Sequence, residues 1–285
     1  MFKKTVCILL SVLLLLPLCA CGNQKKLTVL VSISGREEEL EMLEGLKKSV
    51  EKSKIEIKEE ILSDMSRFSE YQEDILSKYN ADNTDVVFST VGINFSYAGT
   101  IPYIASESNL LDDVAKPLFS APVNAFSPDE LSRAAGQYVQ EHYDQGSNVG
   151  LAITQYSEFA HGGYETLRNN LHHFNFVNFV EVYGDNDNIK KDAGAYIKDN
   201  DIDIMLYADT YFRGAPCECF SDAEHVIYYG MFSKDDISGG CDALVGNSYY
   251  EYGASIGEQL INYSKGIEPT DVLLPITVVT KDGAK

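Results

Sequence analysis

Residues 243–281 decide the fold of this chain, and they read ALVGNSYYEYGASIGEQLINYSKGIEPTDVLLPITVVTK. An apolar strand at 243–247 leads into a polar turn at 248–251 and an amphipathic run at 252–265 that a glycine stops. A second apolar strand is expected at 272–279. Apolar spacing that changes from strand to helix and back predicts a strand–helix–strand unit closing an α/β protein.

The rest of the chain repeats this alternation. We expect strands at 27–33, 55–62, 84–90, 101–105, 149–153, 177–183, 202–207 and 226–229, with helices between most of them. Two helix starts have the form of a capping box, Ser34 to Glu37 and Ser127 to Glu130. The first of these helices carries an apolar stripe of Leu40, Leu43, Leu46 and Val50. Strands that alternate with helices predict parallel, doubly wound sheets.

The chain divides near residues 117–126, where no helical pattern is present. We therefore predict two Rossmann-like α/β lobes with parallel sheets, joined by a multi-strand hinge. The first lobe comprises 27–123 plus 248–271, and the second comprises 124–247 plus 272–285. The chain length of 285 residues is sufficient for two lobes of ordinary domain size.

The amino terminus has the pattern of an export signal. Lys3 and Lys4 precede an apolar run at 6–18 that is too short to span a bilayer. The run ends in Leu18-Cys19-Ala20-Cys21, which is similar to a bacterial lipobox. We predict a signal peptide at 1–20, lipidation of Cys21 and a tether at 21–26, which anchors the chain on the extracytoplasmic face of the cell membrane. An ordinary secretory signal with a chance cysteine is the alternative.

Charge and motifs exclude several function classes. The net charge of −20 argues against nucleic acid or an anionic membrane surface as a partner. The sequence contains no Gly-x-Ser-x-Gly elbow, phosphate loop, His-Glu-x-x-His motif or dinucleotide-binding Gly-x-Gly-x-x-Gly. We therefore expect neither an enzyme nor a bound cofactor.

Three cysteines, Cys217, Cys219 and Cys241, remain in the exported chain beyond Cys21. An odd number in an exported protein predicts one disulfide and one free thiol. A bridge between Cys217 and Cys219 would be strained, so either of them is expected to pair with Cys241. A metal site that adds His225 is an alternative, but its spacing matches no standard zinc motif.

Polar and aromatic residues follow the predicted strands, where ligands bind in open α/β sheets. The candidate ligand-binding residues are Arg36, Asn94, Phe95, Glu107, Tyr156, Glu158, Asp209, Phe232 and Asn247. Aromatic rings beside carboxylates and amides suit a sugar, because rings cover its apolar face while acceptors and donors bind its hydroxyls. The same set suits nucleosides or amino acids. The alternative is structural: the acids can be solvated loop residues and the rings can pack the hinge.

Several segments together carry a resemblance to type I periplasmic binding proteins of the sugar-binding kind. The tail Pro275-x-Thr277-x-Val279-Thr280-Lys281-Asp282 is similar to that family's carboxyl terminus. The strand 101–108 is similar to the family strand that ends in a sugar-binding Asp-Arg pair, with Glu107 in place of the aspartate and Ser108 in place of the arginine. The resemblance implies ligand roles for Asp209 and for the hinge-adjacent Asn247, whereas Phe232 replaces the family's ligand-binding aspartate.

The resemblance implies a solute-binding lipoprotein of an ABC importer, with a small polar ligand between its lobes and an ABC permease as partner. One alternative within this class is a binding protein for nucleosides or aromatic amino acids, since the pattern from Tyr249 to Gly257 is similar to that of the aromatic amino acid branch. Another alternative is a lipoprotein sensor that signals ligand occupancy to a membrane kinase.

Overall fold

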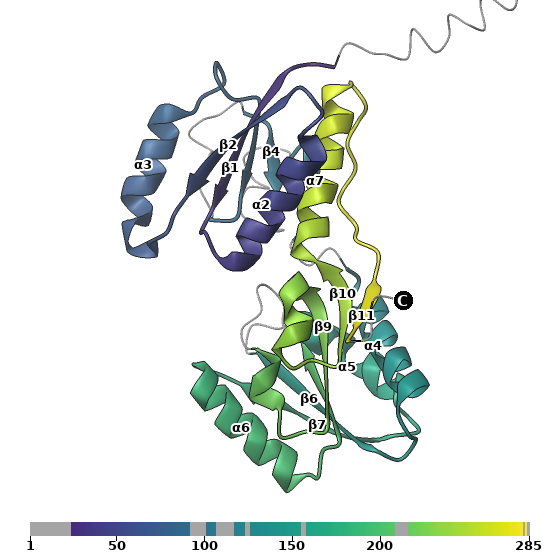
Figure 1. Ribbon diagram of the computed structural model, residues 1–285. Coiled ribbons are helices and arrows are strands. Elements are labelled where there is room, and N and C mark those ends of the chain that lie inside the picture. The colour runs from purple at the N-terminus through teal and green to yellow at the C-terminus, as the bar shows by residue number, and fades with distance from the viewer. Residues whose placement is uncertain are drawn as a thin grey trace, which may run out of the picture.

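A computed structural model of the protein describes residues 24–91, 101–106, 117–122, 126–154, 158–208, 216–281 and 283. These residues form two α/β lobes, one above the other in Figure 1, each built around its own sheet. The predicted α/β class with two parallel-dominated sheets is confirmed.

The first lobe contains a parallel sheet with the strand order β2-β1-β3-β4-β5. Its strands are β1 (Leu27–Ile33), β2 (Ile55–Ile61), β3 (Val86–Ser89), β4 (Tyr103–Ala105) and β5 (Phe119–Ser120). Its early helices are α2 (Glu37–Val50), the 3-10 turn η1 (Met65–Arg67) and α3 (Phe68–Lys78). Every residue of β1 except Thr28 is buried, as expected for a central strand covered on both faces.

The second lobe contains the strand order β11-β10-β9-β8-β6-β7, in which only β11 is antiparallel to its neighbour. Its strands are β6 (Asn148–Thr154), β7 (Asn175–Val182), β8 (Ile204–Ala208), β9 (His225–Phe232), β10 (Ala243–Ser248) and β11 (Thr277–Thr280). Its helices are α4 (Pro128–His142), α5 (Glu158–Asn170), α6 (Asn186–Asp199), and the 3-10 turns η3 (Cys217–Phe220) and η4 (Lys234–Gly239).

Helix α7 (Tyr249–Ser264) follows β10 without a loop but belongs to the first lobe, where it packs on α2 (Figure 1). The chain therefore crosses between the lobes three times: from β5 to α4, from β10 to α7, and from α7 to β11. The last crossing runs beside the first, because the Val272 N–H donates to the Ser120 carbonyl at 2.8 Å and the Ser120 N–H donates to Asp271 at 2.7 Å. The Tyr252 hydroxyl also donates to the Ala121 carbonyl at this point.

Helices α2 and α7 contact each other through three glycines. A methyl group added at Gly253 would lie 1.8 Å from the Met42 carbonyl oxygen, and one added at Gly45 would lie 1.9 Å from the Tyr250 carbonyl oxygen. Gly257 faces the Ser49 hydroxyl in the same way. The two backbones thus touch with no side chain between them. The Gly-x-x-x-Gly pattern in α7 serves this packing.

A disulfide joins Cys217 to Cys241, and Cys219 is a buried thiol outside the disulfide that contacts the Asn186 carbonyl at 3.6 Å. This pairing is one of the two expected from the sequence. It connects η3 to the turn that precedes β10, so it closes a loop beside η4 in the second lobe. The bridge also uses two of the four donors of the alternative metal site.

Four local predictions were wrong. Residues 249–251 form the first turn of α7, because Ser248 is its N-cap and accepts from the Glu251 N–H at 3.1 Å. Residues 272–276 are the last crossing and not a strand; Pro275 has no N–H to pair. The N-cap of α2 is Arg36, since Ser34 bonds to Glu39 and forms no capping box. Leu40 is 42% exposed, because Glu39 and Met42 face inward instead.

The helix start predicted at Ser127 is confirmed, and the structure shows one of the two hydrogen bonds of a capping box there. Ser127 is the N-cap of α4, its hydroxyl accepts from the Glu130 N–H, and Pro128 occupies the first helical position. Among the described residues, no helix is both long enough and apolar enough to cross a membrane.

We predict that Gly253→Ala destabilises the protein by about 2 kcal/mol, because the added methyl group meets a backbone carbonyl that cannot move alone. An interior glycine-to-alanine change normally stabilises a helix by about 1 kcal/mol, so the expected sign is reversed. Urea unfolding measures the difference. Gly194→Ala in α6 is the control, since its methyl group meets only the exposed Asp222 carboxylate. Equal effects of the two changes would contradict the packing argument.

Candidate functional site

The candidate site is the pair of sheet edges at which the strands of the two lobes end. Two crossings leave from these edges, since the chain passes from the carboxyl end of β5 to the second lobe and from the carboxyl end of β10 to the first. The carboxyl edges therefore face each other across the hinge. We call these two sheet edges the interlobe edges. The first includes Ser34, Thr90 and Ser106, and the second includes Ser233, Asn247 and Ser248.

Glu39 organises the first interlobe edge. Its side chain is 1% exposed, and one carboxylate oxygen accepts from the Ser34 N–H at 2.7 Å and from the Ser34 hydroxyl. The other oxygen accepts from the Thr90 hydroxyl. Glu39 lies in the first turn of α2, where the helix dipole favours a negative charge. It thereby connects the turn after β1 to the turn after β3.

Arg36 lies at the start of the same helix. It is exposed and occupies the N-cap position of α2, two residues beyond Ser34. The end of β4 is fixed separately, because the Ser106 hydroxyl donates to the Ser89 carbonyl at 2.7 Å. The first edge thus presents a positive charge and several hydroxyls on a backbone held by buried hydrogen bonds.

Asn247 and its neighbours form the hinge side of the second edge. Asn247 is 4% exposed; its amide nitrogen donates to the Pro275 carbonyl at 2.8 Å and its amide oxygen accepts from the Ser248 N–H at 2.8 Å. These bonds tie the second crossing to the third. Thr277 adds a bond from its hydroxyl to the Gly246 carbonyl at 2.9 Å. The structure therefore gives Asn247 a hinge contact, and its predicted ligand contact stays a prediction.

Gly246 and Gly230 allow β10 and β9 to approach closely at this edge. They are register partners, and both have positive φ, +145° and +149°. A methyl group at Gly246 would lie 1.9 Å from the Gly230 carbonyl oxygen. Glycine is required here both for the dihedral angle and for the space.

Phe232 ends β9 and is 4% exposed, and its ring packs in the second-lobe core with Tyr228, Leu244 and Cys217. The residue after it is the one that reaches the other lobe: the Ser233 hydroxyl donates to the Glu41 carboxylate on α2, 192 residues away in sequence. Phe232 thus anchors the segment from which Ser233 extends.

The remaining predicted residues are not placed by the structure. Asn94, Phe95, Glu107, Tyr156, Asp209 and the lipidation residue Cys21 lie outside the described residues. Glu158 begins α5, and its side chain also lies outside the described part. Their ligand-binding and lipidation roles stay predictions.

Sequence reasoning missed Glu39, Glu41 and Ser233. The triple Glu37-Glu38-Glu39 has the pattern of a solvated acidic first turn, and nothing in it distinguishes the buried member. Ser233 directly follows an apolar strand, as the other edge residues do. This position could have marked it as a candidate site residue. Its partner on α2 could not be inferred, because the contact exists only between the lobes.

A groove of about 650 Å³ lies in the first lobe between the carboxyl end of β2 and α3. Its lining includes the carboxylates of Asp64, Glu70, Glu73 and Asp74, and Arg67, which pairs with Glu70 at 3.1 Å. Among the described residues this surface is acidic and open. It adjoins the first interlobe edge, because the Leu62 N–H in its lining donates to the Ile33 carbonyl, directly before Ser34, at 2.8 Å.

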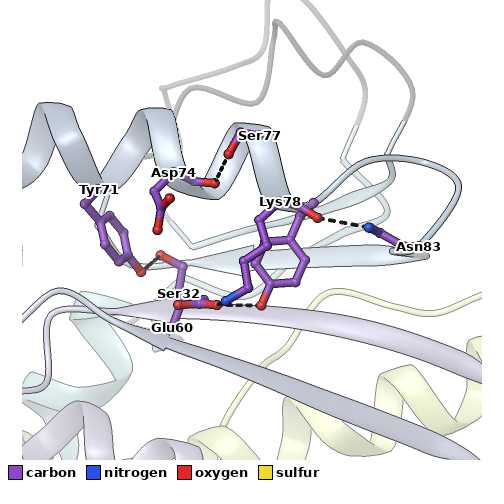
Figure 2. Close-up of polar contacts among 8 residues, drawn as sticks. Ser32, Glu60, Tyr71, Asp74, Ser77, Lys78 and Asn83 are labelled. Atoms are coloured by element: carbon purple, nitrogen blue, oxygen red, sulfur yellow. Dashed lines mark hydrogen bonds and ion pairs between the residues drawn. The ribbon is translucent and has the colours of Figure 1, made fainter.

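Figure 2 shows the polar contacts that join β1 and β2 to α3 beside this groove. The Ser32 and Tyr71 hydroxyls share a hydrogen bond of 2.9 Å, and burial raises the pKa of Tyr71 to about 12. Glu60 accepts from Lys78 and from the Tyr79 hydroxyl. Burial opposes ionisation of Glu60, but these two hydrogen bonds outweigh it and hold its pKa below the ordinary value. The polar groups here bond to one another and stabilise the lobe.

Metal chemistry finds no support within the described part of the chain, where no group of three or more His, Cys, Asp or Glu side chains is arranged to bind a metal ion.

The chain matches no protein-family model and no curated protein. Its structure is similar to solved structures over most of its length. The periplasmic ribose ABC transporter structure from Conexibacter woesei is 14% identical with a TM-score of 0.66, and the match covers 92% of this chain and 94% of that one. AraP, an arabinose-binding protein from Geobacillus stearothermophilus, is 14% identical with a TM-score of 0.65 over 90% and 97% of the two chains.

A chain in the complex of the TorS sensor domain with TorT, solved without ligand, is also similar, with 14% identity, a TM-score of 0.64 and coverage of 90% and 92%. Likeness of this extent, together with two parallel sheets and a three-crossing hinge, defines the fold. The protein has the type I periplasmic binding fold, as the sequence resemblance indicated.

We predict that Glu39→Ala destabilises the protein by about 2 kcal/mol, because it leaves a half-buried N–H and two half-buried hydroxyls without their acceptor. Urea unfolding measures the loss. Glu37→Ala, at an exposed position in the same turn, is the control and should change stability by less than about 0.5 kcal/mol. A similar small effect at both positions would show that Glu39 does not hold the edge.

Proposed function

We propose that this protein is an extracytoplasmic solute-binding lipoprotein that binds a small polar ligand between its two lobes. The observation that carries the proposal is the hinge: two independent sheets, joined by three crossings, present their carboxyl edges to each other. Ligands of open α/β sheets bind at such edges. Two rigid lobes on a narrow hinge can open and close around a ligand.

A sugar or related polyol is the proposed ligand class. The first edge offers hydroxyl groups of Ser34, Thr90 and Ser106 together with the guanidinium of Arg36. The protons of the three hydroxyls are directed to Glu39 and to the Ser89 carbonyl, so these oxygens can accept hydrogen bonds from a ligand's hydroxyl groups, while the guanidinium of Arg36 can donate to them. The likeness to ribose- and arabinose-related binding proteins supports the same class. Nucleosides and aromatic amino acids remain the alternatives within this proposal.

We also propose that the protein delivers its ligand to an ABC permease. A lipid on Cys21 anchors the chain to the outer face of the membrane. Support comes from the lipobox-like segment and from the description of the similar structures as parts of ABC transporters. Binding rather than catalysis is inferred, since the sequence lacks the nucleophile and metal motifs of common enzymes.

A sensor role is the second candidate. The likeness to a chain of the TorS–TorT complex is nearly as close as the likeness to the sugar-binding proteins. In that role the closed protein would contact a membrane kinase. Genes for a permease and an ATPase beside this gene favour import, whereas a histidine kinase gene favours sensing.

The ligand is tested by a thermal-shift screen of the exported chain against monosaccharides, nucleosides and amino acids. Ligand at about a hundredfold above its dissociation constant stabilises the folded state by about 2.7 kcal/mol, which raises the midpoint by several degrees. We expect a shift with sugars that Asp209→Ala abolishes and Asp199→Ala, at an exposed position in α6, retains. A complete screen without any shift would remove the support for solute binding. Asn247 is not a suitable test position, because its replacement also breaks the hinge contact to Pro275.

Lipid attachment is tested by metabolic labelling with a fatty-acid analogue. The full-length chain should incorporate the label and remain in the membrane fraction, and Cys21→Ser should lose both properties. Cys219→Ser is the matched control, since its thiol lies in the exported fold and is buried. Labelling that persists in Cys21→Ser would contradict the proposal.

A further inference from the structure

The hydrogen bond between Ser233 and Glu41 joins the two lobes at a point that is not one of the covalent crossings. Glu41 belongs to α2 and Ser233 follows β9, and both side chains are half-buried. Phe232, the residue before Ser233, is the register partner of Ser248, where the second crossing begins. The contact therefore lies about one strand spacing, roughly 5 Å, from the hinge.

Both partners are held by rigid surroundings. Ser233 is the N-cap of η4 in a capping box: its hydroxyl oxygen accepts from the Asp236 N–H, and the Asp236 carboxylate accepts from the Ser233 N–H at 2.8 Å. The hydroxyl has one proton, and it is directed to Glu41. On one side Phe232 anchors the segment in the core, and on the other η4 leads to Cys241 and its disulfide.

The helix that carries Glu41 is also held firmly in its lobe. It is two residues from Glu39, so the two carboxylates leave α2 in nearly opposite directions. Glu39 points into its own lobe, toward Ser34 and Thr90, and Glu41 points to the second lobe. Helix α2 is in turn bound to α7 by backbone contact. A displacement of one lobe relative to the other therefore stretches this bond, because the backbone at each end is held by its own lobe.

We propose that Glu41 and Ser233 are positioning residues that hold the two lobes in the arrangement seen here. Their bond lowers the free energy of this arrangement relative to more open ones. A ligand that contacts both interlobe edges binds the arrangement in which the edges are close. The bond thus raises the fraction of molecules competent to bind and the apparent affinity by the same factor. This consequence for affinity rests on the proposed function, whereas the effect on the lobes does not.

The test measures the distance between the lobes without ligand. Spin labels on Lys52→Cys, after α2, and Lys191→Cys, on α6, report that distance in the full chain by pulsed dipolar spectroscopy; both positions are exposed. A sample without the introduced cysteines corrects for labelling of Cys219 and of the three amino-terminal cysteines. Glu41→Ala should raise the ratio of open to compact molecules about tenfold, as expected for loss of a half-buried hydrogen bond to a carboxylate.

Matched variants separate this role from a local one. Glu44→Ala, one turn along α2 and exposed, should leave the distance distribution unchanged. Ser233→Ala should match Glu41→Ala, and Ser233→Thr should restore the parent distribution because it keeps the hydroxyl. The double variant should be no more open than Glu41→Ala alone, since both changes break one bond.

Three outcomes would overturn the proposal: no change in Glu41→Ala, an equal change in Glu44→Ala, or a change in Ser233→Ala alone, which would assign Ser233 only to the cap of η4. Because these measurements contain no ligand, a failed ligand screen would reject the proposed function and leave the positioning role intact. Conversely, a sugar hit with an unchanged distance distribution would reject only the positioning role.

Discussion

The backbone contact between α2 and α7 is the constraint on which the two-lobed structure depends. Helix α7 begins directly after the last residue of β10 in the second lobe, yet it packs in the first. Glycines 45, 253 and 257 remove the side chains that would otherwise separate the helices. A helix that enters from one lobe and is fixed in the other transmits any hinge rotation to the whole first lobe. The hinge can therefore act between two rigid bodies.

Polar side chains have two different roles at the interlobe edges: some hold the backbone in place, and others are proposed to contact the ligand. Glu39 forms hydrogen bonds within its own lobe, and Asn247 forms them within the hinge. Groups with such committed hydrogen bonds preorganise a site rather than adapt to a ligand. Arg36 at the N-cap can donate hydrogen bonds to a ligand, and the Ser34 and Thr90 hydroxyls, whose protons are directed to Glu39, can accept them. The second lobe contributes Ser233, which is directed across to Glu41. The proposed binding protein thus has a rigid frame on both sides of its ligand.

The fold could be predicted from local pattern because each strand–helix unit has a characteristic apolar spacing within a short sequence window. The boundaries of β1 were predicted to the residue, since its mostly apolar run is bounded by Lys26 and Ser34. The prediction failed where tertiary partners replaced the local ones. Ser34 bonds to Glu39 instead of capping α2, and residues 272–276 pair with the first crossing and with Asn247 instead of extending β11. Such partners cannot be predicted from the local sequence.

The sequence by itself determined the class of this protein: two α/β lobes, a Gly-x-x-x-Gly helix after the penultimate strand, and one disulfide to Cys241. The lobes and the helix follow from apolar periodicity, which can be read in short windows of sequence. The single disulfide follows from the number of cysteines in the exported chain. Only the tertiary structure decided which of three consecutive glutamates is buried, which cysteine pairs with Cys241, and that Ser233 reaches Glu41. Each of these depends on contacts between residues far apart in the chain, and their free energy arises only when the lobes are packed.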